Sequence, residues 1–483
     1  MPEVLKGLKP ESVMRNFELL TQIPRGSGNE EAVSNFLVEF GKKLGLETYQ
    51  DEVKNVYIKK PATKGYENKP GVVIQGHMDM VCEKEKNVEF DFEKDPIQLV
   101  VKDDMIYANG TTLGADNGIA VAMGMSVLED DTLEHPAVEV FVTVNEESGM
   151  DGANGADPAH IEGKYIINID SEEEGFITVS CAGGKNVLST LPVTFEDVDS
   201  NKKAIEIVVE GLKGGHSGME IVLQRANASK LLGRILHLLT VEYDLADIEG
   251  GTKHNAIPRE ANATILIDSA NQEELAKQIK SIEDTFKNEF ATADPGLKVS
   301  IIEATKTPEK VLSSDSKEKI LQFILVSPHG VQTVSQEIEG LVESSANFAI
   351  MKLNENDITF LSSIRSSIIS IREEIAERIF SLSKLVGATV TIESQYPAWE
   401  HAKDSKLEKL AYDVWKKTTG KDPEITAIHA GLECGILLDK LEGFEAISIG
   451  PDTFDVHTPN EHVSIKSIEN VWNYLVELLK EIN

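Results

Sequence analysis

Cysteines, basic residues and long apolar runs are all scarce in this chain of 483 residues. The three cysteines, Cys82, Cys181 and Cys434, have no paired spacing, which argues against a disulfide framework and favours a reducing compartment. Lys and Arg number 47 against 81 Asp and Glu, and the net charge of -34 argues against nucleic acid or an anionic membrane as partner. No run reaches the ~20 apolar residues of a membrane span, and the opening MPEVLKGLKPESVMRNF has no apolar leader. We therefore expect a cytoplasmic protein.

The length exceeds that of one typical hydrophobic core and predicts two domains. Strands alternate with helices in residues 1–184, and this α/β pattern returns in residues 396–483. Residues 185–395 have a more antiparallel pattern, so we interpret them as an α+β domain inserted into a discontinuous α/β domain. Segments 247–268 and 337–361 share a faint likeness, which hints at a duplicated subdomain within the insertion.

The pattern of the first domain predicts where its elements begin and end. The opening residues favour two amphipathic helices, with Ser12 and Ser27 as candidate N-caps. Apolar runs predict strands over 71–81, 137–147 and 164–170, and a glycine turn opens a helix over 111–130. Such an alternation favours a partly parallel sheet.

Polar residues gather where these strands are expected to end. His77 and Asp79 lie two residues apart, and so on one face, near the end of one strand; the pair Glu146–Glu147 ends another and Asp170 ends a third, with Asp116 in the glycine turn. Neighbouring side chains on a strand point to opposite faces, so we expect the two glutamates to face apart. Because ligands bind beyond the carboxyl ends of strands in open α/β sheets, these residues predict one crevice. His457 could close the crevice from the C-terminal part.

This residue set suits metal ions. Imidazole with carboxylates is a ligand set for Zn²⁺, Mn²⁺ or Co²⁺. Two histidines and three acids are too many for one hydrolytic zinc, whereas two metals about 4 Å apart, bridged by one carboxylate, would use them all. Glu146, beside the ligand Glu147, could then take the proton of an attacking water. Each motif alone has a simpler interpretation as a core pair, a turn or a solvated strand end, and only their common position favours the metal site.

The motifs GHMDMV, LGADNGIA, NEESGMDG, NIDSEEEG, GGHSG and HTPNE together resemble those of the di-metal exopeptidases of the aminoacylase and carboxypeptidase clan. The likeness is closest to the aminoacyl-histidine dipeptidases (Xaa-His or β-alanyl-histidine dipeptidases) and covers essentially the whole chain. It implies a three-layer αβα catalytic domain of the zinc-exopeptidase type with a mixed sheet, interrupted by an α+β lid domain.

The resemblance also implies a role for each matching residue. His77 and Asp170 would hold one metal and Glu147 and His457 the other, with Asp116 bridging them. Asp79 would orient His77, Glu146 would be the general base, and His216 of the lid would face the oxygen of the tetrahedral intermediate. Asn255, Arg365 and Gly431 match positions that hold the terminal carboxylate of the substrate.

Two further details concern the residue after Asp116. Many relatives have a second acid where this chain has Asn117, which removes one negative charge from the site. Relatives also have a cis peptide bond after the bridging aspartate, so we expect one between Asp116 and Asn117.

The predicted function is metal-dependent hydrolysis of unblocked dipeptides, preferentially those with C-terminal histidine, with two divalent ions per chain. Zinc is the expected metal, and manganese and cobalt are alternatives. Other activities of the clan stay open: tripeptidase, N-acyl-amino-acid deacylase or unspecific dipeptidase. A metal-binding scaffold protein without catalysis is the alternative from another class. A small peptide is the expected partner, and the sequence leaves open whether the chain forms a homodimer.

Overall fold

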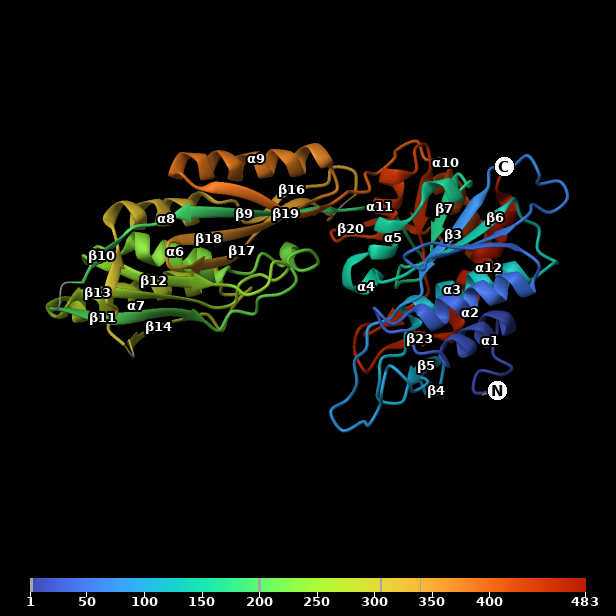
Figure 1. The fold of residues 1–483 in the computed structure, drawn as a ribbon, viewed down its shortest axis with the longest axis horizontal. Helices are drawn as coiled ribbons and strands as arrows, with labels where there is room; N and C mark the ends of the chain where they lie inside the picture. Colours follow the sequence, from blue (N-terminus) through green and yellow to red (C-terminus); the bar gives the residue numbers. More distant parts are fainter. Residues whose placement is uncertain (1–2, 199–200, 305, 339) are drawn as a thin grey trace. The chain divides into compact units, whose positions relative to one another are not determined.

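The computed structural model describes residues 3–198, 201–304, 306–338 and 340–483, which form two compact units (Figure 1). The first unit comprises Met1–Ser180, His401–Ala427 and Leu432–Asn483. The second comprises Cys181–Glu400 and Ile428–Gly431, so the short segment 428–431 belongs with the inserted part. The roles of catalytic domain and lid stay predictions for these two units.

A mixed sheet of eight strands forms the centre of the first unit, in the order β1-β2-β6-β3-β7-β21-β8-β20. The strands are β1 (Glu47–Gln50), β2 (Val56–Lys60), β3 (Val72–His77), β6 (Val138–Thr143), β7 (Tyr165–Asn168), β8 (Phe176–Cys181), β20 (Glu424–Ile428) and β21 (Glu445–Ser448). β3 runs parallel to both β6 and β7, and β21 runs parallel to β7. β3, β6 and β7 are buried along their length, as expected of parallel strands covered on both faces.

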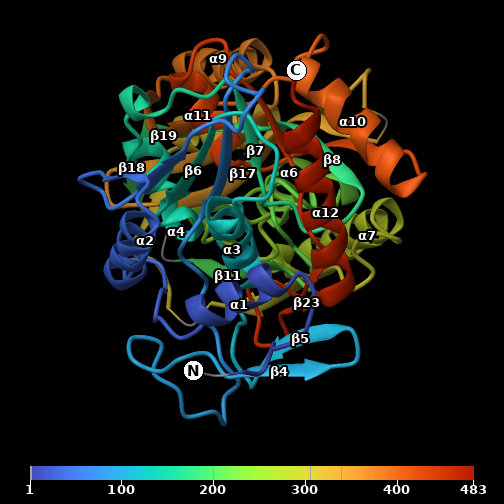
Figure 2. The same ribbon diagram turned by 90° about the vertical axis from the view of Figure 1, so that its right-hand side faces the viewer.

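Helices cover both faces of this sheet, which gives the predicted three-layer α/β arrangement (Figures 1 and 2). α3 packs on β3 and β6 and is itself covered by α1, whereas α10 packs on both β21 and α12. The helices are α1 (Glu11–Leu20), α2 (Glu31–Lys43), α3 (Ala115–Glu129), α4 (Glu146–Gly149), α5 (Asp151–Gly155), α10 (Lys406–Thr419), α11 (Glu433–Lys440) and α12 (Ile465–Glu481), with a 3-10 turn, η1 (Pro158–His160).

In a second, small sheet of the first unit, strands from the C-terminal part of the chain pair with strands from the N-terminal half. Its order is β22-β23-β5-β4, formed by β4 (Leu99–Lys102), β5 (Met105–Ala108), β22 (Thr453–Phe454) and β23 (His462–Ser464). β23 pairs with β5, which anchors both ends of the loop between β22 and β23. This loop carries His457.

The second unit is built on an antiparallel sheet in the order β14-β11-β13-β12-β17-β18-β9-β19, with β16 paired to β17. The strands of the unit are β9 (Gly183–Pro192), β10 (Phe195–Asp197), β11 (Lys202–Glu210), β12 (Asp244–Gly250), β13 (Ala261–Asp268), β14 (Lys298–Glu303), β15 (Lys310–Leu312), β16 (Gly330–Val334), β17 (Val342–Leu353), β18 (Asp357–Ser366) and β19 (Thr389–Tyr396). The helices are α6 (Ala228–Leu238), α7 (Gln272–Glu289), α8 (Ser314–Val326) and α9 (Ile369–Val386), with 3-10 turns η2 (Ile221–Leu223) and η3 (Ser269–Asn271).

The strand order of this sheet is symmetrical about the junction of β12 and β17. On one side β13 is followed in the chain by α7 and β14, and on the other β18 is followed by α9 and β19. This symmetry agrees with the hypothesis of a duplicated subdomain, which stays a prediction; residue 339 of the second compared segment lies outside the described residues.

The predicted N-caps were wrong. α1 begins after Pro10 and α2 after Glu30, neither of which caps its helix with a side chain. Ser12 lies inside α1, and Ser27 instead donates a hydrogen bond to the carboxylate of Asp79 at 2.8 Å. In the part of the chain that the structure describes, no helix has the length and apolar character needed to cross a membrane.

Candidate metal centre

The ends of three neighbouring strands bring the predicted site residues together. His77 is the last residue of β3, Asp170 follows β7 after one residue, and the Glu146–Glu147 pair follows β6 after two. Since β3 is parallel to both β6 and β7, the carboxyl ends of these strands meet at one edge of the sheet. The strand ends that carry the predicted site residues therefore meet in the first unit, as expected from the sequence.

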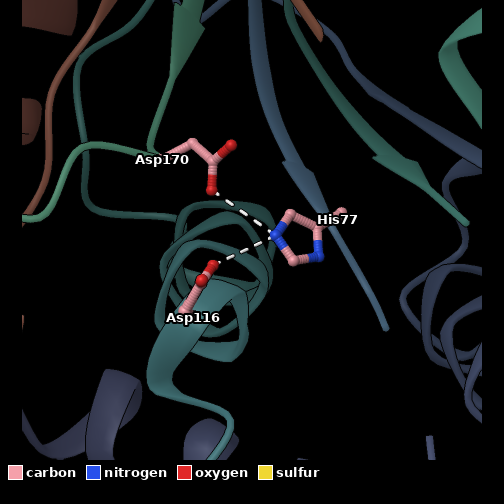
Figure 3. A group of neighbouring side chains, drawn as sticks. All are labelled: His77, Asp116 and Asp170. Carbon is pink, nitrogen blue, oxygen red and sulfur yellow. Dashed lines mark hydrogen bonds and ion pairs between the residues drawn. The ribbon is translucent and has the colours of Figure 1, made fainter. Parts of the chain in front are cut away.

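One group of candidate metal ligands surrounds the ring of His77. Its Nε2 atom lies 3.1 Å from Oδ1 of Asp116 and 3.5 Å from Oδ1 of Asp170 (Figure 3). The His77 side chain is 1% exposed and that of Asp170 is 8% exposed. One nitrogen and two carboxylate oxygens thus converge in a nearly closed space.

A second group shares Asp116 with the first. Nε2 of His457 lies 3.1 Å from Oδ2 of Asp116 and 3.0 Å from Oε2 of Glu147. Asp116 therefore offers one oxygen to the group around His77 and the other oxygen to the group around His457. This is the arrangement that a carboxylate bridging two metal ions requires.

The local backbone explains how Asp116 and His457 reach these positions. The peptide bond between Asp116 and Asn117 is cis, as predicted from the resemblance. Asn117 accepts a hydrogen bond from the N–H of His77 at 3.2 Å and donates one to the carbonyl of Ile169 at 2.6 Å. His457 has a positive φ of 63°, a left-handed conformation that is uncommon outside glycine.

The expectation that the two glutamates face apart on a strand was wrong. β6 ends at Thr143, and Asn145, in the left-handed conformation, begins the short helix α4. On a helical turn adjacent side chains are not opposed, and donor atoms of Glu146 and Glu147 both lie within 4.8 Å of a ring nitrogen of His77. Both carboxyl groups therefore lie near the same histidine ring and do not point to opposite faces of a sheet.

Asp79 connects the histidine ring to the glutamate pair. Its Oδ1 lies 3.3 Å from Nδ1 of His77, and its carboxylate accepts hydrogen bonds from the backbone N–H groups of Glu146 (3.0 Å) and Glu147 (3.3 Å). Burial opposes its ionisation, but the contacts with His77 and Ser27 keep the pKa of Asp79 below its ordinary value. The carboxylate of Asp79 thus lies beside Nδ1 of His77, while Nε2 of the ring faces the two aspartates.

The electrostatics of the protein alone favour a bound cation. Burial raises the pKa of Glu146 well above its ordinary value and that of Asp170 to about 6, and each is raised further by neighbouring carboxyl groups. Among the described residues, no lysine or arginine lies within ion-pair distance of either carboxyl group. Hydrogen bonds to Asp116 and Glu147 raise the pKa of His457 to about 11, so these two carboxylates favour a positive charge beside them. Two imidazoles and several oxygens fit a pair of divalent metals.

A buried polar layer beneath the strand ends was not found from the sequence. Glu433, at the start of α11, accepts hydrogen bonds from Gln75 (2.6 Å) and Thr143 (2.7 Å), and Asn168 donates to Gln75 (2.6 Å). Burial raises the pKa of Glu433 to about 7. These residues stand in apolar runs, where a lone polar residue gives no local signal of its partners.

His216 of the second unit is a neutral hydrogen-bond donor. Its Nδ1 faces the backbone N–H groups of Gly218 (3.3 Å) and Met219 (3.1 Å) and accepts from them, which leaves the proton on Nε2. Burial and the charge of Arg365 lower the pKa of His216. The ring therefore presents an uncharged N–H group at Nε2.

The other predicted substrate-binding residues lie in the same unit. Arg365 is 8% exposed and donates from Nη1 to the hydroxyl of Tyr396 at 2.7 Å, while its buried Nε has no hydrogen-bond partner among the described residues. The carbonyl of Asn255 accepts a hydrogen bond from Ser217, next to His216. A Cβ placed on Gly218 would lie 3.1 Å from the His216 ring and 3.3 Å from Nε of Arg365, so these two side chains converge there.

Gly431 is placed less directly. It belongs to the segment Ile428–Gly431 of the second unit, and in this segment the carbonyl of His429 would lie 2.5 Å from the same added Cβ on Gly218. Among the described residues, no hydrogen bond joins Gly431 itself to His216, Asn255 or Arg365, so its role stays a prediction.

Comparison with known proteins identifies the class to which this site belongs. The model of peptidase family M20/M25/M40 matches residues 73–481, and the chain belongs to this family. It is therefore a peptidase, and the resemblance stated from the motifs is confirmed. The cytosol non-specific dipeptidase of Escherichia coli (strain K12) is 37% identical over 480 residues, which cover 99% of each chain.

Solved structures agree with this assignment. The aminoacylhistidine dipeptidase of Vibrio alginolyticus is 35% identical, with a TM-score of 0.92 over 100% of this chain and 98% of that one. The aminopeptidase PepT of Bacillus cereus ATCC 10987 is 16% identical, with a TM-score of 0.58 over 98% of this chain and 99% of that one, and shares the fold. The fold class expected from the sequence is confirmed.

Proposed function

We propose that the chain is a di-metal dipeptidase that hydrolyses unblocked dipeptides, preferentially those with a C-terminal histidine. The observation that carries this proposal is the placement of Asp116 between His77 and His457, with one carboxylate oxygen toward each ring. The names of the two similar proteins, a non-specific dipeptidase and an aminoacylhistidine dipeptidase, support the substrate class.

In this proposal His77 and Asp170 would hold one metal ion, Glu147 and His457 would hold the other, and Asp116 would be shared between them. Zinc suits the nitrogen and oxygen donors, and manganese and cobalt suit them too. When bound, the two ions would polarise the peptide carbonyl and lower the pKa of the attacking water.

Glu146 is proposed as the general base. It lies beside the ligand Glu147 in the group around His77, and its carboxyl group is not an ion-pair partner of either imidazole at 4 Å or less among the described contacts. It is thus free to take a proton from the attacking water and to return it to the leaving amino group. Asp79, which contacts both the His77 ring and the backbone N–H of Glu146, would hold these two residues in place during the proton transfer.

The second unit is proposed to bind the substrate. The Nε2–H group of His216 would donate to the carbonyl oxygen that becomes negatively charged in the transition state. Arg365, whose Nε is unpartnered, would bind the terminal carboxylate, since a guanidinium can donate to a carboxylate through two N–H groups. Asn255 and Gly431 are proposed to complete this carboxylate site.

A substrate panel tests the proposal. The purified protein with Zn²⁺ should release histidine from β-Ala-His and from Xaa-His dipeptides faster than it cleaves Xaa-Leu dipeptides. Equal rates on both dipeptides would favour an unspecific dipeptidase, which the name of the Escherichia coli relative makes the first alternative. Preferred cleavage of Gly-Gly-Gly would indicate a tripeptidase, and release of acetate from an N-acetyl amino acid would indicate a deacylase. Metal binding without turnover of any of these would indicate a scaffold protein.

We also propose a cytoplasmic location, which the name of the cytosol dipeptidase relative and the scarcity of cysteine support. The net charge of -34 supports a small peptide rather than nucleic acid or an anionic membrane as partner. Sedimentation of the purified chain would distinguish a monomer from a homodimer.

A further inference from the structure

Glu461, the last residue of the HTPNE motif, has no role in the proposed mechanism, yet it is only 2% exposed. Its Oε2 accepts hydrogen bonds from the backbone N–H groups of Leu113 (2.8 Å) and Gly114 (3.0 Å). Its Oε1 accepts from those of Ala115 (2.8 Å) and Asp116 (3.3 Å). One carboxylate therefore holds four successive amide groups, and the last of them belongs to the shared ligand Asp116.

These amides belong to the turn that leads into α3, where Asp116 and Asn117 still have non-helical backbone angles and no side chain of the helix acts as a cap. The first N–H groups of a helix have no partner within the helix and need an outside acceptor. The N-cap residue is Gly114, which has a φ of 69° and no side chain that could accept a hydrogen bond. Glu461 supplies the missing acceptors from a segment far along the chain, and its negative charge suits the positive end of the helix dipole.

Arg25 secures the same turn from another direction. Its Nη1 donates to the carbonyls of Met78 (2.9 Å) and Asp79 (3.0 Å), and its Nη2 donates to the carbonyl of Gly114. The Arg25 side chain is buried, at 2% exposure. It therefore joins the segment that follows His77 to the residue that begins α3.

Three separate segments carry His77, Asp116 and His457, and these two buried residues join them. Arg25 connects the first segment to the second, and Glu461, in the same loop as His457, connects the second to the third. We propose that Glu461 and Arg25 are positioning residues, which hold the three ligands at the spacing that two metal ions require before the ions bind. This inference rests on the proposed metal site.

The test is the affinity of the folded protein for Zn²⁺ alone, measured by competition with a coloured chelator. Glu461→Gln keeps the shape of the side chain, but its amide nitrogen cannot accept, so two of the four N–H groups lose their partner. We expect the affinity for at least one zinc ion to fall by about 10–100-fold, the usual effect of losing a residue that orients a ligand. Excess Zn²⁺ should then restore kcat, with an unchanged KM for the dipeptide.

A matched variant separates positioning from general stability. Glu139 of β6 is 7% exposed and accepts hydrogen bonds from the N–H of Glu162 through both oxygens, at 3.0 and 3.1 Å. Glu139→Gln should lower the thermal stability of the metal-free protein without changing its affinity for zinc. The proposal is overturned if Glu461→Gln binds two zinc ions as tightly as the unaltered chain.

A second variant keeps the test decisive. If circular dichroism shows that Glu461→Gln is unfolded, Arg25→Lys replaces it, because one ammonium group cannot bridge the three carbonyls that the guanidinium joins. Reduced zinc affinity in Arg25→Lys supports the proposal, and unchanged affinity overturns it. If the unaltered chain itself binds fewer than two zinc ions, the proposed di-metal function is wrong. This result differs from the one that contradicts the positioning role of Glu461 and Arg25, in which the unaltered chain and the variant bind two zinc ions equally well.

Discussion

Glu146→Ala and Glu147→Ala are expected to impair the enzyme in different ways, the first through turnover and the second through metal binding, although the two residues are adjacent. Both oxygens of Glu147 lie within 3.1 Å of the His457 ring nitrogen, whereas none of the described ion pairs joins Glu146 to a histidine. Glu147→Ala should therefore weaken binding of one metal by about 10-fold or more, since a direct ligand contributes at least as much as a residue that only orients one.

Glu146→Ala should retain both metals and lose turnover. A general base contributes about 10²–10⁴-fold, which corresponds to about 3–5 kcal/mol in the activation barrier. We expect kcat to fall by this factor with little change in KM, and added metal should give no rescue. Glu146→Asp shortens the side chain by one methylene group and should lower kcat by about 100-fold, because a small misplacement of a reacting group slows the reaction strongly.

Metal analysis of the dialysed variants, together with kcat at saturating metal, decides between the two roles. If Glu146→Ala loses metal and Glu147→Ala keeps it, the assignment is reversed. If both variants keep two metals and full turnover, the pair is a solvated acidic turn and the proposed mechanism is refuted.

Four other predictions follow from the same structure. A chelator should abolish hydrolysis, and Zn²⁺, Mn²⁺ or Co²⁺ should restore it with about two ions per chain; full activity in a metal-free preparation would contradict this. His216→Ala should lower kcat by about 100-fold or more at unchanged metal content, and an effect on KM alone would make His216 a substrate-binding residue instead. Arg365→Lys should raise KM for dipeptides with a free C-terminal carboxylate and leave KM for dipeptide amides unchanged. Only the free carboxylate can accept hydrogen bonds from two N–H groups of the guanidinium at once. Asn117→Asp should destabilise the metal-free protein by about 1–3 kcal/mol in urea unfolding, because a carboxylate cannot donate to the carbonyl of Ile169 at 2.6 Å; equal stability would show that this contact is dispensable.

The residues that the sequence could predict are those whose position follows from a local pattern. His77 and Asp170 end apolar runs, and parallel strands bring such ends together whatever the rest of the fold does. Asp116 stands at a glycine turn that opens a helix, which the pattern also reveals. The two glutamates were predicted at the right place but with the wrong geometry, because the pattern does not show that β6 ends at Thr143 and a left-handed residue begins α4.

The supports of the ligands could not be predicted in this way, because their partners are backbone groups far away in the sequence. Arg25 follows a proline in an ordinary turn, and nothing nearby shows that its guanidinium will bind three carbonyls. Glu461 stands 345 residues after the Asp116 amide that it holds. A helix whose N-cap position is a glycine predicts that some acceptor is missing, but not which residue supplies it. The ligands of such a site can therefore be predicted from the ends of strands in the sequence, whereas the residues that fix the spacing of the ligands can be identified only from the folded structure.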